Sequence, residues 1–315
     1  MKMLVTGGLG FIGSNFILHV LNNYENYEIV NVDDELTGSN HRNLYEIEKS
    51  SNYNFVKGNI NNHTLMNKLI ADCDAVVNFA AESHVDRSIE NARPFIDSNF
   101  LGVFTILEIL RKYKKRLVHI STDEVFGSLE HDSADESFRL NPSSPYSATK
   151  ASAELLINSY VVTHGIDAVI TRCTNNYGPR QFPEKLIPKA ILFAGKNKKI
   201  PIQNHGKGVR DWIFVEDHCS AILNVLEKGE SGESYNISAH NEFDVLTVIG
   251  KILSIMNKPS DLYEFVQDRP GHDYRYSLDS SKIRSKLKWS PKVNFEDGVK
   301  NTVEWYIKNN NWFDN

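Results

Sequence analysis

Short apolar runs alternate with longer amphipathic segments along most of this chain. The short runs are rich in Val, Ile and Leu, which is typical of strands buried on both faces of a parallel sheet. The longer segments repeat their apolar residues every three or four positions, as helices packed on a sheet do. The pattern predicts strands at 2–6, 28–32, 54–57, 75–79, 117–120, 168–173 and 233–237, and helices from Gly13 through Leu21 and at 62–70, 94–113, 145–165 and 215–227. Regular alternation of this kind predicts an α/β fold with a doubly wound parallel sheet.

The character of the sequence changes after Cys173. The segment 175–183 is dense in Asn, Gly and Pro, which favour loops over regular structure. A chain of 315 residues also exceeds the size at which a single hydrophobic core usually stops growing. We therefore predict a first domain at 1–174, to which the segment 213–241 returns, and a second, smaller substrate-binding domain formed by 175–212 and 242–315.

Charge and cysteine content narrow the class of protein. The formal net charge is -5 and the longest basic run is 112–116, so the sequence does not indicate a nucleic-acid partner. The N-terminus enters a strand at once, and no apolar run approaches the about 18 residues of a membrane-spanning helix. Cys73, Cys173 and Cys219 show no metal-ligand spacing and leave an odd thiol, which is typical of a reducing compartment. We expect a cytosolic protein without disulfides, bound metal or a membrane partner.

Glycines connect the first predicted strand to the first predicted helix. Gly7, Gly10 and Gly13 stand in the strand, loop and helix context that the dinucleotide-binding fingerprint requires. Such glycines let the backbone approach a pyrophosphate, whose charge is met by the amides of the helix N-terminus. Asp33 ends the second strand about 20 residues beyond the last glycine, where a carboxylate can accept both hydroxyls of an adenosine ribose. No arginine follows Asp33 directly, so the motif favours a Rossmann-type site for NAD over one for NADP. A tight turn with an incidental aspartate is the weaker alternative.

A hydroxyl and two carboxylates follow the buried strand at 117–120. Thr122, Asp123 and Glu124 therefore stand at the carboxyl edge of the predicted sheet, where open α/β sheets bind their ligands. Adjacent acidic residues after a strand are also common as turn or helix caps. Their position favours the catalytic interpretation.

A second candidate group opens the helix at 145–165. Ser144 suits an N-cap and Pro145 the first helical position, which places Tyr146 and Lys150 at i and i+4 on one face. A phenol beside an ammonium group is a recognisable base. We predict that this pair and the residues after the strand at 117–120 belong to one catalytic site.

Two other polar residues allow competing interpretations. His84 follows a buried strand, where a histidine either binds a backbone group or contacts a ligand. Arg210 stands beside Asp211 and could pair with it at the surface. The neighbouring Gly206 and Gly208 favour phosphate binding by Arg210 instead, because a guanidinium group matches two phosphate oxygens.

Several segments together resemble one known family. They are the glycine loop at 7–13, the segments 78–89, 121–125, 146–150 and 171–179, and the run at 269–272. In combination they are similar to the dTDP-glucose 4,6-dehydratases, which are extended short-chain dehydrogenases/reductases, and the similarity runs almost from end to end. The Thr-Asp-Glu run at 122–124 is its most specific part, because related epimerases and decarboxylases keep the Tyr-Lys pair without both carboxylates.

The resemblance implies a set of site residues. For NAD they are Gly7, Gly10, Phe11, Ile12, Gly13, Asp33, Asn59, Ile60, Ala80, Ala81, Glu82, Ser83, Asn99, Tyr146, Lys150 and Asn176. For the nucleotide-sugar substrate they are His84, Thr122, Asn175, Lys185, Leu186, Pro201, Ile202, Arg210, Asp268, Arg269 and His272. The implied catalytic residues are Thr122, Asp123, Glu124, Tyr146 and Lys150.

The chain departs from the family pattern at a few positions. Asn59 stands in place of the usual aspartate, Phe126 in place of the usual tyrosine, and 34–37 in place of a segment that contains lysine. No asparagine follows 241–242, where the family often has one. These differences leave the nucleotide base open among dTDP, UDP and CDP.

Chemistry predicts a role for each catalytic residue. Losing water across carbons 5 and 6 of a hexose requires an acidic carbon-5 proton, which a ketone at carbon 4 supplies. We expect the pKa of Tyr146, ordinarily near 10, to be lowered by Lys150 and the cationic nicotinamide, so that Tyr146 takes the 4-hydroxyl proton. Glu124 then removes the carbon-5 proton and Asp123 protonates the leaving hydroxyl. A 4-epimerase, a decarboxylase and a dinucleotide-sensing regulator are the alternatives.

The resemblance also implies an oligomeric state. The predicted helices at 94–113 and 145–165 are similar to the pair that forms a four-helix interface between subunits in the family. We therefore predict a homodimer.

Overall fold

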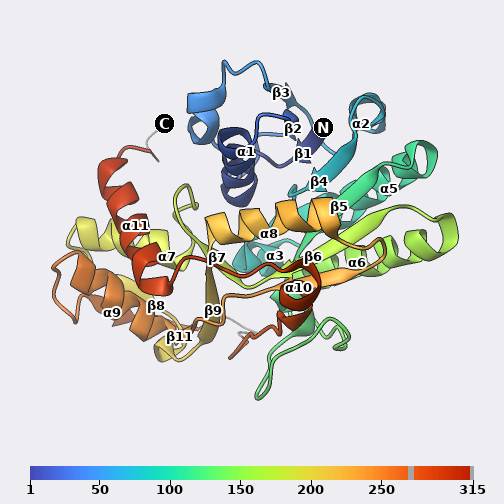
Figure 1. Cartoon of the computed structure of the whole chain (residues 1–315). Helices are drawn as coiled ribbons and strands as arrows, with labels where there is room; N and C mark the ends of the chain where they lie inside the picture. Colours follow the sequence, from blue (N-terminus) through green and yellow to red (C-terminus); the bar gives the residue numbers. More distant parts are fainter. Residues whose placement is uncertain (269–272, 313–315) are drawn as a thin grey trace.

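The computed structural model describes residues 1–268 and 273–312. Its centre is a parallel sheet of seven strands in the order β10-β6-β5-β4-β1-β2-β3 (Figure 1). The strands are β1 (Lys2–Thr6), β2 (Glu28–Asp33), β3 (Tyr53–Lys57), β4 (Ala75–Asn78), β5 (Arg116–Thr122), β6 (Ala168–Cys173) and β10 (Ser234–Ile237). The strand order reverses between β1 and β4, which is the point where doubly wound sheets open a ligand crevice. The predicted α/β fold is confirmed.

Helices cover both faces of this sheet. On one face lie α1 (Phe11–Asn23), α8 (Val215–Lys228) and α10 (Ser281–Leu287), whose apolar residues join one core with the strands. On the other lie α2 (His63–Ala71), α5 (Gly102–Tyr113) and α6 (Pro145–His164), which form a second core. Because both faces are covered, β1, β4 and β6 are buried almost throughout, as the apolar residues within them predicted.

One predicted helix is a composite of three segments. The region at 94–113 contains α4 (Arg93–Phe95), a π-helical stretch (Ile96–Leu101) and α5. The short helix α3 (Val85–Glu90) precedes it. A π-helical insertion shifts the hydrogen-bond pattern by one residue and so changes the side chains that a helix presents to its neighbours. Here it turns Asn99 inward, where its side chain is 1% exposed.

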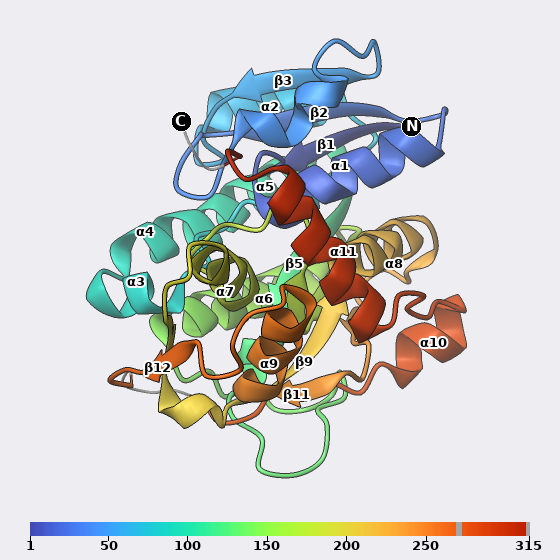
Figure 2. The ribbon, with the colours of Figure 1, turned by 90° about the vertical axis from the view of Figure 1, so that its left-hand side faces the viewer.

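A smaller lobe lies beside the carboxyl edge of the sheet. It contains the three-stranded sheet β11 (Glu242–Asp244), β9 (Val209–Phe214) and β7 (Asn175–Tyr177), and the pair β12 (Tyr263–Phe265) and β8 (Ile200–Ile202). Figure 2 shows α7 (Leu186–Gly195), α9 (Val245–Ile255) and α11 (Phe295–Lys308) beside these strands. The three helices share a third apolar core with β7 and β9. Among the described residues, none of the helices is long and apolar enough to span a bilayer.

Candidate active site

A cleft of about 540 Å³ opens at the carboxyl ends of the central strands. Residues from the ends of β1, β2, β4, β5 and β6 line it, together with the start of α1 and the first two turns of α6. The volume is in the range usual for cofactor and substrate sites. Within residues 1–268 and 273–312, no three His, Cys, Asp or Glu side chains gather in a way that could hold a metal ion.

The glycine loop brings the backbone of β1 close to the end of β4. A Cβ atom on Gly7 would lie 2.7 Å from the Cα atom of Ala80, and Gly7 has a φ of +69°. A Cβ atom on Gly13 would lie 2.5 Å from the carbonyl oxygen of Gly7. Helix α1 begins after Gly10 without a side-chain cap or an acidic residue in its first turn. Its amide groups are therefore suited to an anion such as a pyrophosphate, and the residues fit a bound dinucleotide.

Asp33 ends β2, lines the cleft beside the glycine loop and is 6% exposed. One carboxylate oxygen accepts from the amide of Leu9 at 3.0 Å, and the other accepts from the hydroxyl of Ser39 at 2.7 Å. Beyond it, Asn59 donates its side-chain amide to Asp34 at 2.8 Å. This pair explains the departure at position 59, since an aspartate there would place two like charges together.

The two carboxylates follow β5 in a short 3-10 helix (Asp123–Phe126). Thr122 caps this helix by accepting from the amide of Glu124, so the carboxylates themselves are not its caps. Asp123 is 4% exposed and accepts from the Thr122 hydroxyl at 3.1 Å through Oδ1. Its Oδ2 atom is buried without a hydrogen-bond partner among the described residues. Burial, reinforced by the nearby Glu124, raises the pKa of Asp123 to about 8.

Tyr146 and Lys150 lie in the first two turns of α6, where the sequence predicted them. Ser144 and Ser147 form a capping box and Pro145 occupies the first turn, which fixes the position of Tyr146. The Tyr146 amide donates to the hydroxyl of Ser88, and the ring packs edge-on against another aromatic ring. Lys150 is 3% exposed, and burial lowers its pKa to about 8.

The protein by itself does not lower the pKa of Tyr146, and the predicted lowering also involves the cationic nicotinamide. Burial and the negative charge of Glu124 raise the pKa of this phenol well above its ordinary value. The Nζ atom of Lys150 donates to the carbonyl of Ile120 at 2.6 Å. The protein alone therefore favours the protonated phenol of Tyr146.

Most of the residues predicted for the site line the cleft. They are Gly7, Gly10, Phe11, Ile12, Gly13, Asp33, Asn59, Ile60, Ala80, Ala81, Glu82, Ser83, Thr122, Asp123, Glu124, Tyr146, Lys150, Asn175, Asn176 and Lys185. Asn99 lies behind the wall, where its side chain bonds to both the amide and the carbonyl of Glu82. His84, Leu186, Pro201, Ile202, Arg210 and Asp268 are also outside the lining. Arg269 and His272 lie outside the described residues.

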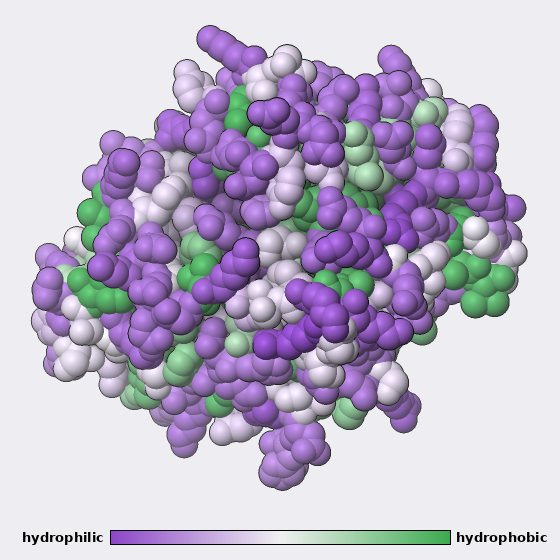
Figure 3. Space-filling view, in the orientation of Figure 1, coloured by the Kyte–Doolittle hydropathy of each residue, from purple (hydrophilic) through white to green (hydrophobic). Residues whose placement is uncertain are grey.

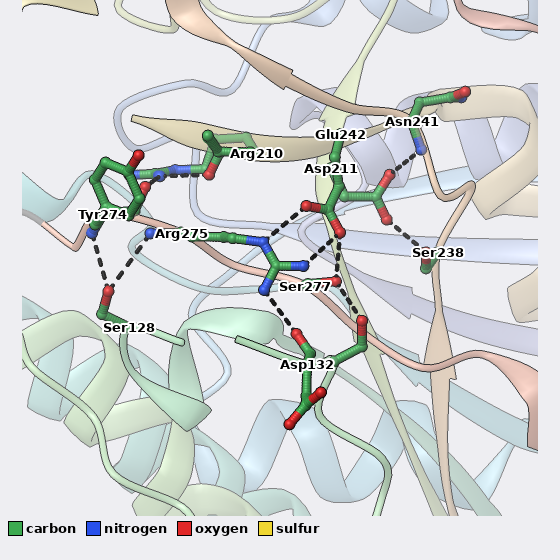
Figure 4. A network of polar contacts seen from close by, with 12 residues as sticks. Ser128, Asp132, Arg210, Asp211, Ser238, Asn241, Glu242, Tyr274, Arg275 and Ser277 are labelled. Atoms are coloured by element: carbon green, nitrogen blue, oxygen red, sulfur yellow. Dashed lines mark hydrogen bonds and ion pairs between the residues drawn. The ribbon is translucent and has the colours of Figure 1, made fainter. Parts of the chain in front are cut away.

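Arg210 and Asp211 do not pair with each other. They alternate on β9 and so point to opposite sides, and both are buried. Figure 4 shows the guanidinium group of Arg210 directed toward Tyr274, to whose carbonyl it donates at 3.0 Å. Asp211 instead accepts from the amide of Asn241 at 2.7 Å and from a serine hydroxyl. The surface-pair interpretation of Arg210 is therefore wrong.

Some residues of the cleft were not predicted. They include Asp34, Leu36, Ser39, Ser121, Cys173, Gln181 and Phe182. Ser121 and Cys173 lie at strand ends and could have been found from their place in the sheet. Gln181 and Phe182 belong to the loop-rich segment after Cys173, whose composition gave no sign of which side chains face the cleft.

Comparisons with known proteins agree with this geometry. The model of the GDP-mannose 4,6 dehydratase family matches residues 4–302, so the chain belongs to this family. A dTDP-glucose 4,6-dehydratase of Mycobacterium tuberculosis is 44% identical over 318 residues, covering 99% of this chain and 95% of the relative. The family resemblance predicted from the sequence motifs is confirmed.

Solved structures give the same result. A dTDP-glucose 4,6-dehydratase from Streptomyces venezuelae, crystallised with NAD, has a TM-score of 0.97 at 40% identity and covers 100% of this chain and 99% of its own. A UDP-glucose 4-epimerase from Thermotoga maritima has a TM-score of 0.90 at 28% identity, with 98% and 99% covered. The fold is thus shared by both activities, and the side chains in the cleft must distinguish them.

Proposed function

We propose that this protein is an NAD-dependent hydro-lyase that converts a nucleotide-activated glucose, dTDP-glucose in the first instance, into the 4-keto-6-deoxy sugar. The observation that carries the proposal is the buried Asp123 with its raised pKa beside Glu124, in the same cleft as Tyr146 and Lys150. An epimerase breaks no bond at carbon 5 or 6 and needs no such pair of carboxyl groups. The higher identity to the dehydratases supports the same choice.

The cofactor is held by the glycine loop and the residues at the ends of β2 and β3. NAD, when bound, accepts a hydride from carbon 4 of the sugar and later returns it to carbon 6. Tyr146 takes the proton of the 4-hydroxyl as that bond is oxidised, and Thr122 holds the same oxygen. We propose that the sugar nucleotide is bound by the segments 175–212 and 242–315, of which Asn175 reaches the cleft.

The two carboxyl groups divide the elimination between them. Asp123 is protonated at neutral pH, because burial has raised its pKa to about 8, and it can therefore give a proton to the departing 6-hydroxyl. Glu124 is more exposed than Asp123 and acts as the base that removes the carbon-5 proton. Neighbouring carboxyl groups tend to divide their protons in this way, since two adjacent negative charges repel.

The direct test is incubation of the purified protein with dTDP-, UDP- and CDP-glucose, followed by mass spectrometry. We expect loss of one water and a 4-keto product from at least one of them, with dTDP-glucose preferred. An isomer of unchanged mass with the galactose configuration would show that the protein is an epimerase and not a dehydratase. If none of the sugars is converted or isomerised, the proposal is wrong.

Cofactor binding gives a separate prediction. Asp33→Ala should lower the fraction of protein that retains NAD through purification, because the ribose hydroxyls lose a charged acceptor and the glycine loop loses its bond from Leu9 to Asp33. A loss of about 1.5–3 kcal/mol, or roughly tenfold to a hundredfold in affinity, is expected for a charged hydrogen bond. Cofactor content can be measured after denaturation. Occupancy equal to that of the parent protein would contradict the assignment of Asp33.

We further propose that the protein is a homodimer that uses α5 and α6. Leu101, which ends the π-helical stretch before α5, and Phe104 on α5 are 38% and 42% exposed. Leu155 and Val162 on α6 are 61% and 84% exposed. Figure 3 shows a mostly hydrophilic face with a hydrophobic group at its right-hand edge, where α5 and α6 lie in Figure 1. Exposed apolar groups on two adjacent helices suit a self-complementary interface.

Light scattering at micromolar concentration tests this interface. The parent protein should have twice the mass of the chain, and the double variant Leu155→Glu with Val162→Glu should be monomeric, because charges would be buried at the interface. Tyr45→Glu, at a position that is 77% exposed on a different part of the molecule, is the matched control and should remain dimeric. A monomeric parent protein would refute the proposal.

We also propose a cytosolic location. Cys73, Cys173 and Cys219 are buried free thiols, which suits a reducing compartment.

A further inference from the structure

Arg180 has a backbone conformation that is unusual for a residue with a side chain. It belongs to the loop after β7, and its φ is +71°, in the left-handed region that favours glycine. The backbone on both sides of it is fixed by other elements. The carbonyl of Pro179 accepts from the Asn15 side chain of α1 at 3.0 Å. The carbonyl of Gln181 accepts from the hydroxyl of Tyr306 on α11 at 2.6 Å. Strained residues held in this way are concentrated at functional sites, so the side chain of Arg180 needs an explanation.

This side chain connects the smaller lobe to the 3-10 helix η1 (His41–Ile47) of the larger one. Its Nε atom donates to the carbonyl of Asn43 at 3.1 Å, and its Nη2 atom pairs with Oε1 of Glu46 at 3.0 Å. The guanidinium carbon lies over the ring of Trp305 on α11, 5.7 Å from the ring centroid. We call Arg180, Asn43, Glu46 and Trp305 the Arg180 clamp.

The segment after α11 reinforces the same connection. Arg42 donates to the carbonyl of Asn311 at 2.7 Å, and the side chain of Asn40 donates to the carbonyl of Trp312 at 3.3 Å. The ring of Trp312 packs edge-on against Trp305, with the centroids 5.5 Å apart. In Figures 1 and 2 the red segment after α11 approaches the blue segment that contains η1. The smaller lobe therefore binds η1 at two places.

Helix η1 in turn fixes one wall of the cleft. Asn40 is the N-cap of η1, and residues 36–39 directly before it line the cleft beside Asp33. We call residues 36–39 the outer wall. The amide of Asn40 and the side chain of Asn43 both donate to the carbonyl of Leu9 in the glycine loop, at 3.0 and 2.8 Å. The position of the outer wall against the glycine loop therefore depends on η1, and the clamp holds η1.

We propose that Arg180 is a positioning residue that holds the outer wall against the glycine loop, so that NAD enters and leaves only when the Arg180 clamp opens. This inference rests on the cofactor part of the proposed function, in which NAD binds at the glycine loop and Asp33. Arg180, Asn43 and Glu46 are outside the lining of the cleft, so the clamp acts on the opening of the wall and not through contact with the cofactor. A protein that stores a hydride on NAD and returns it to the same sugar must keep its cofactor through the whole cycle, and slow release serves this requirement.

The rate of NAD release measures the clamp directly. Protein loaded with radiolabelled NAD is mixed with an excess of unlabelled NAD, and the label that stays on the protein is followed with time. Arg180→Gln should release NAD about tenfold faster or more, which is the effect of losing one charged hydrogen bond. Association should accelerate by a similar factor, because the wall must open for entry as well as for exit. The Kd should therefore change much less than the release rate.

Arg116→Gln is the matched control. The side chain of Arg116 is 22% exposed and that of Arg180 is 18% exposed. Arg116 likewise binds a carboxylate, that of Asp167 at 3.0 Å, and backbone carbonyls, those of Leu226 and Gly229. It begins β5, at the end of the strand opposite the cleft. The control should therefore lose contacts of the same kind and leave both NAD rates unchanged.

Arg180→Gly is a second variant of the clamp. Glycine adopts a φ of +71° without strain, so this substitution removes the side chain and relieves the backbone at the same time. It should fold even if Arg180→Gln does not, and it should also release NAD about tenfold faster or more.

Hydrogen exchange tests the clamp without cofactor. The amide of Asn40 donates to Leu9 and that of Asn43 donates to Asn40, so both exchange only when this segment opens. In cofactor-free protein, peptides that cover residues 36–46 should exchange faster in Arg180→Gln and Arg180→Gly than in the parent protein. The exchange of the same peptides in Arg116→Gln should equal that in the parent.

The results separate this inference from the proposed function. Equal release rates in the parent and the Arg180 variants, or equal acceleration by Arg116→Gln, would overturn the inference. Faster release with unchanged association would overturn it as well, because Arg180 would then contribute to affinity and not to opening. If the parent protein binds no NAD, the cofactor part of the proposed function fails, and the exchange measurement alone decides whether Arg180 holds the outer wall.

Discussion

Tyr146→Phe is expected to abolish oxidation of carbon 4 while NAD remains bound. The substitution removes the hydroxyl that receives the substrate proton and leaves the ring in its contact with Phe95, where the centroids are 6.3 Å apart. Loss of a general base typically lowers the rate about 10²- to 10⁴-fold. Single-turnover formation of reduced nicotinamide measures this step directly, and the cofactor content after purification shows whether the site is intact.

Tyr160→Phe is the matched control for that experiment. Tyr160 lies on the same helix, and its hydroxyl donates to Glu108 at 2.6 Å, outside the cleft. The Tyr160→Phe variant should oxidise substrate at the parental rate and lose a small part of its stability, about 1 kcal/mol for one hydrogen bond. If Tyr146→Phe oxidises substrate at close to the parental rate, Tyr146 is not the base.

The second large effect should distinguish the roles of the two carboxyl groups, Asp123 and Glu124. Glu124→Gln is expected to oxidise carbon 4, because that step depends on Tyr146 and Lys150, and then to stop before elimination. Reduced nicotinamide should accumulate. Asp123→Asn should also accumulate it, but with Glu124 still present the carbon-5 proton should exchange slowly with solvent deuterium. Loss of the acid or the base should lower dehydration about 10²- to 10⁴-fold.

The pH dependence adds an independent check on Asp123. The acid must be protonated to assist the leaving hydroxyl, so dehydration by the parent protein should decrease as the pH rises through about 8. Parental dehydration by both variants would contradict the dehydratase assignment. Faster carbon-5 exchange in Glu124→Gln than in Asp123→Asn would reverse the two roles.

Much of the candidate site could be predicted because strand ends are local features. The apolar run before Thr122 identified a buried strand, and in a parallel sheet the residues after such strands meet at one edge. The glycine loop, Asp33 and the start of α6 followed from turn and capping preferences that involve only neighbouring residues. These are the parts of the cleft that the structure brings together.

The remaining features depend on contacts between residues distant in sequence. Asn59 is explained by Asp34, which is 25 positions away. Arg210 donates to the carbonyl groups of Asp273 and Tyr274, which lie more than 60 positions later. The sequence neighbour Asp211 therefore did not indicate the partner of Arg210. The position of Asn99 behind the cleft wall follows from a π-helical stretch that periodicity does not reveal.

The sequence by itself determined the order of strands and helices, the family, and which residue types stand at the sheet edge, because these depend on periodicity, local backbone preference and short motifs. Only the tertiary structure decided the protonation of those residues. Burial raises the pKa of Asp123 and Tyr146 and lowers that of Lys150, and burial is a property of everything packed around a side chain. Thr6, Asn78 and His119 likewise lie at one level of the sheet only because three strands align in register.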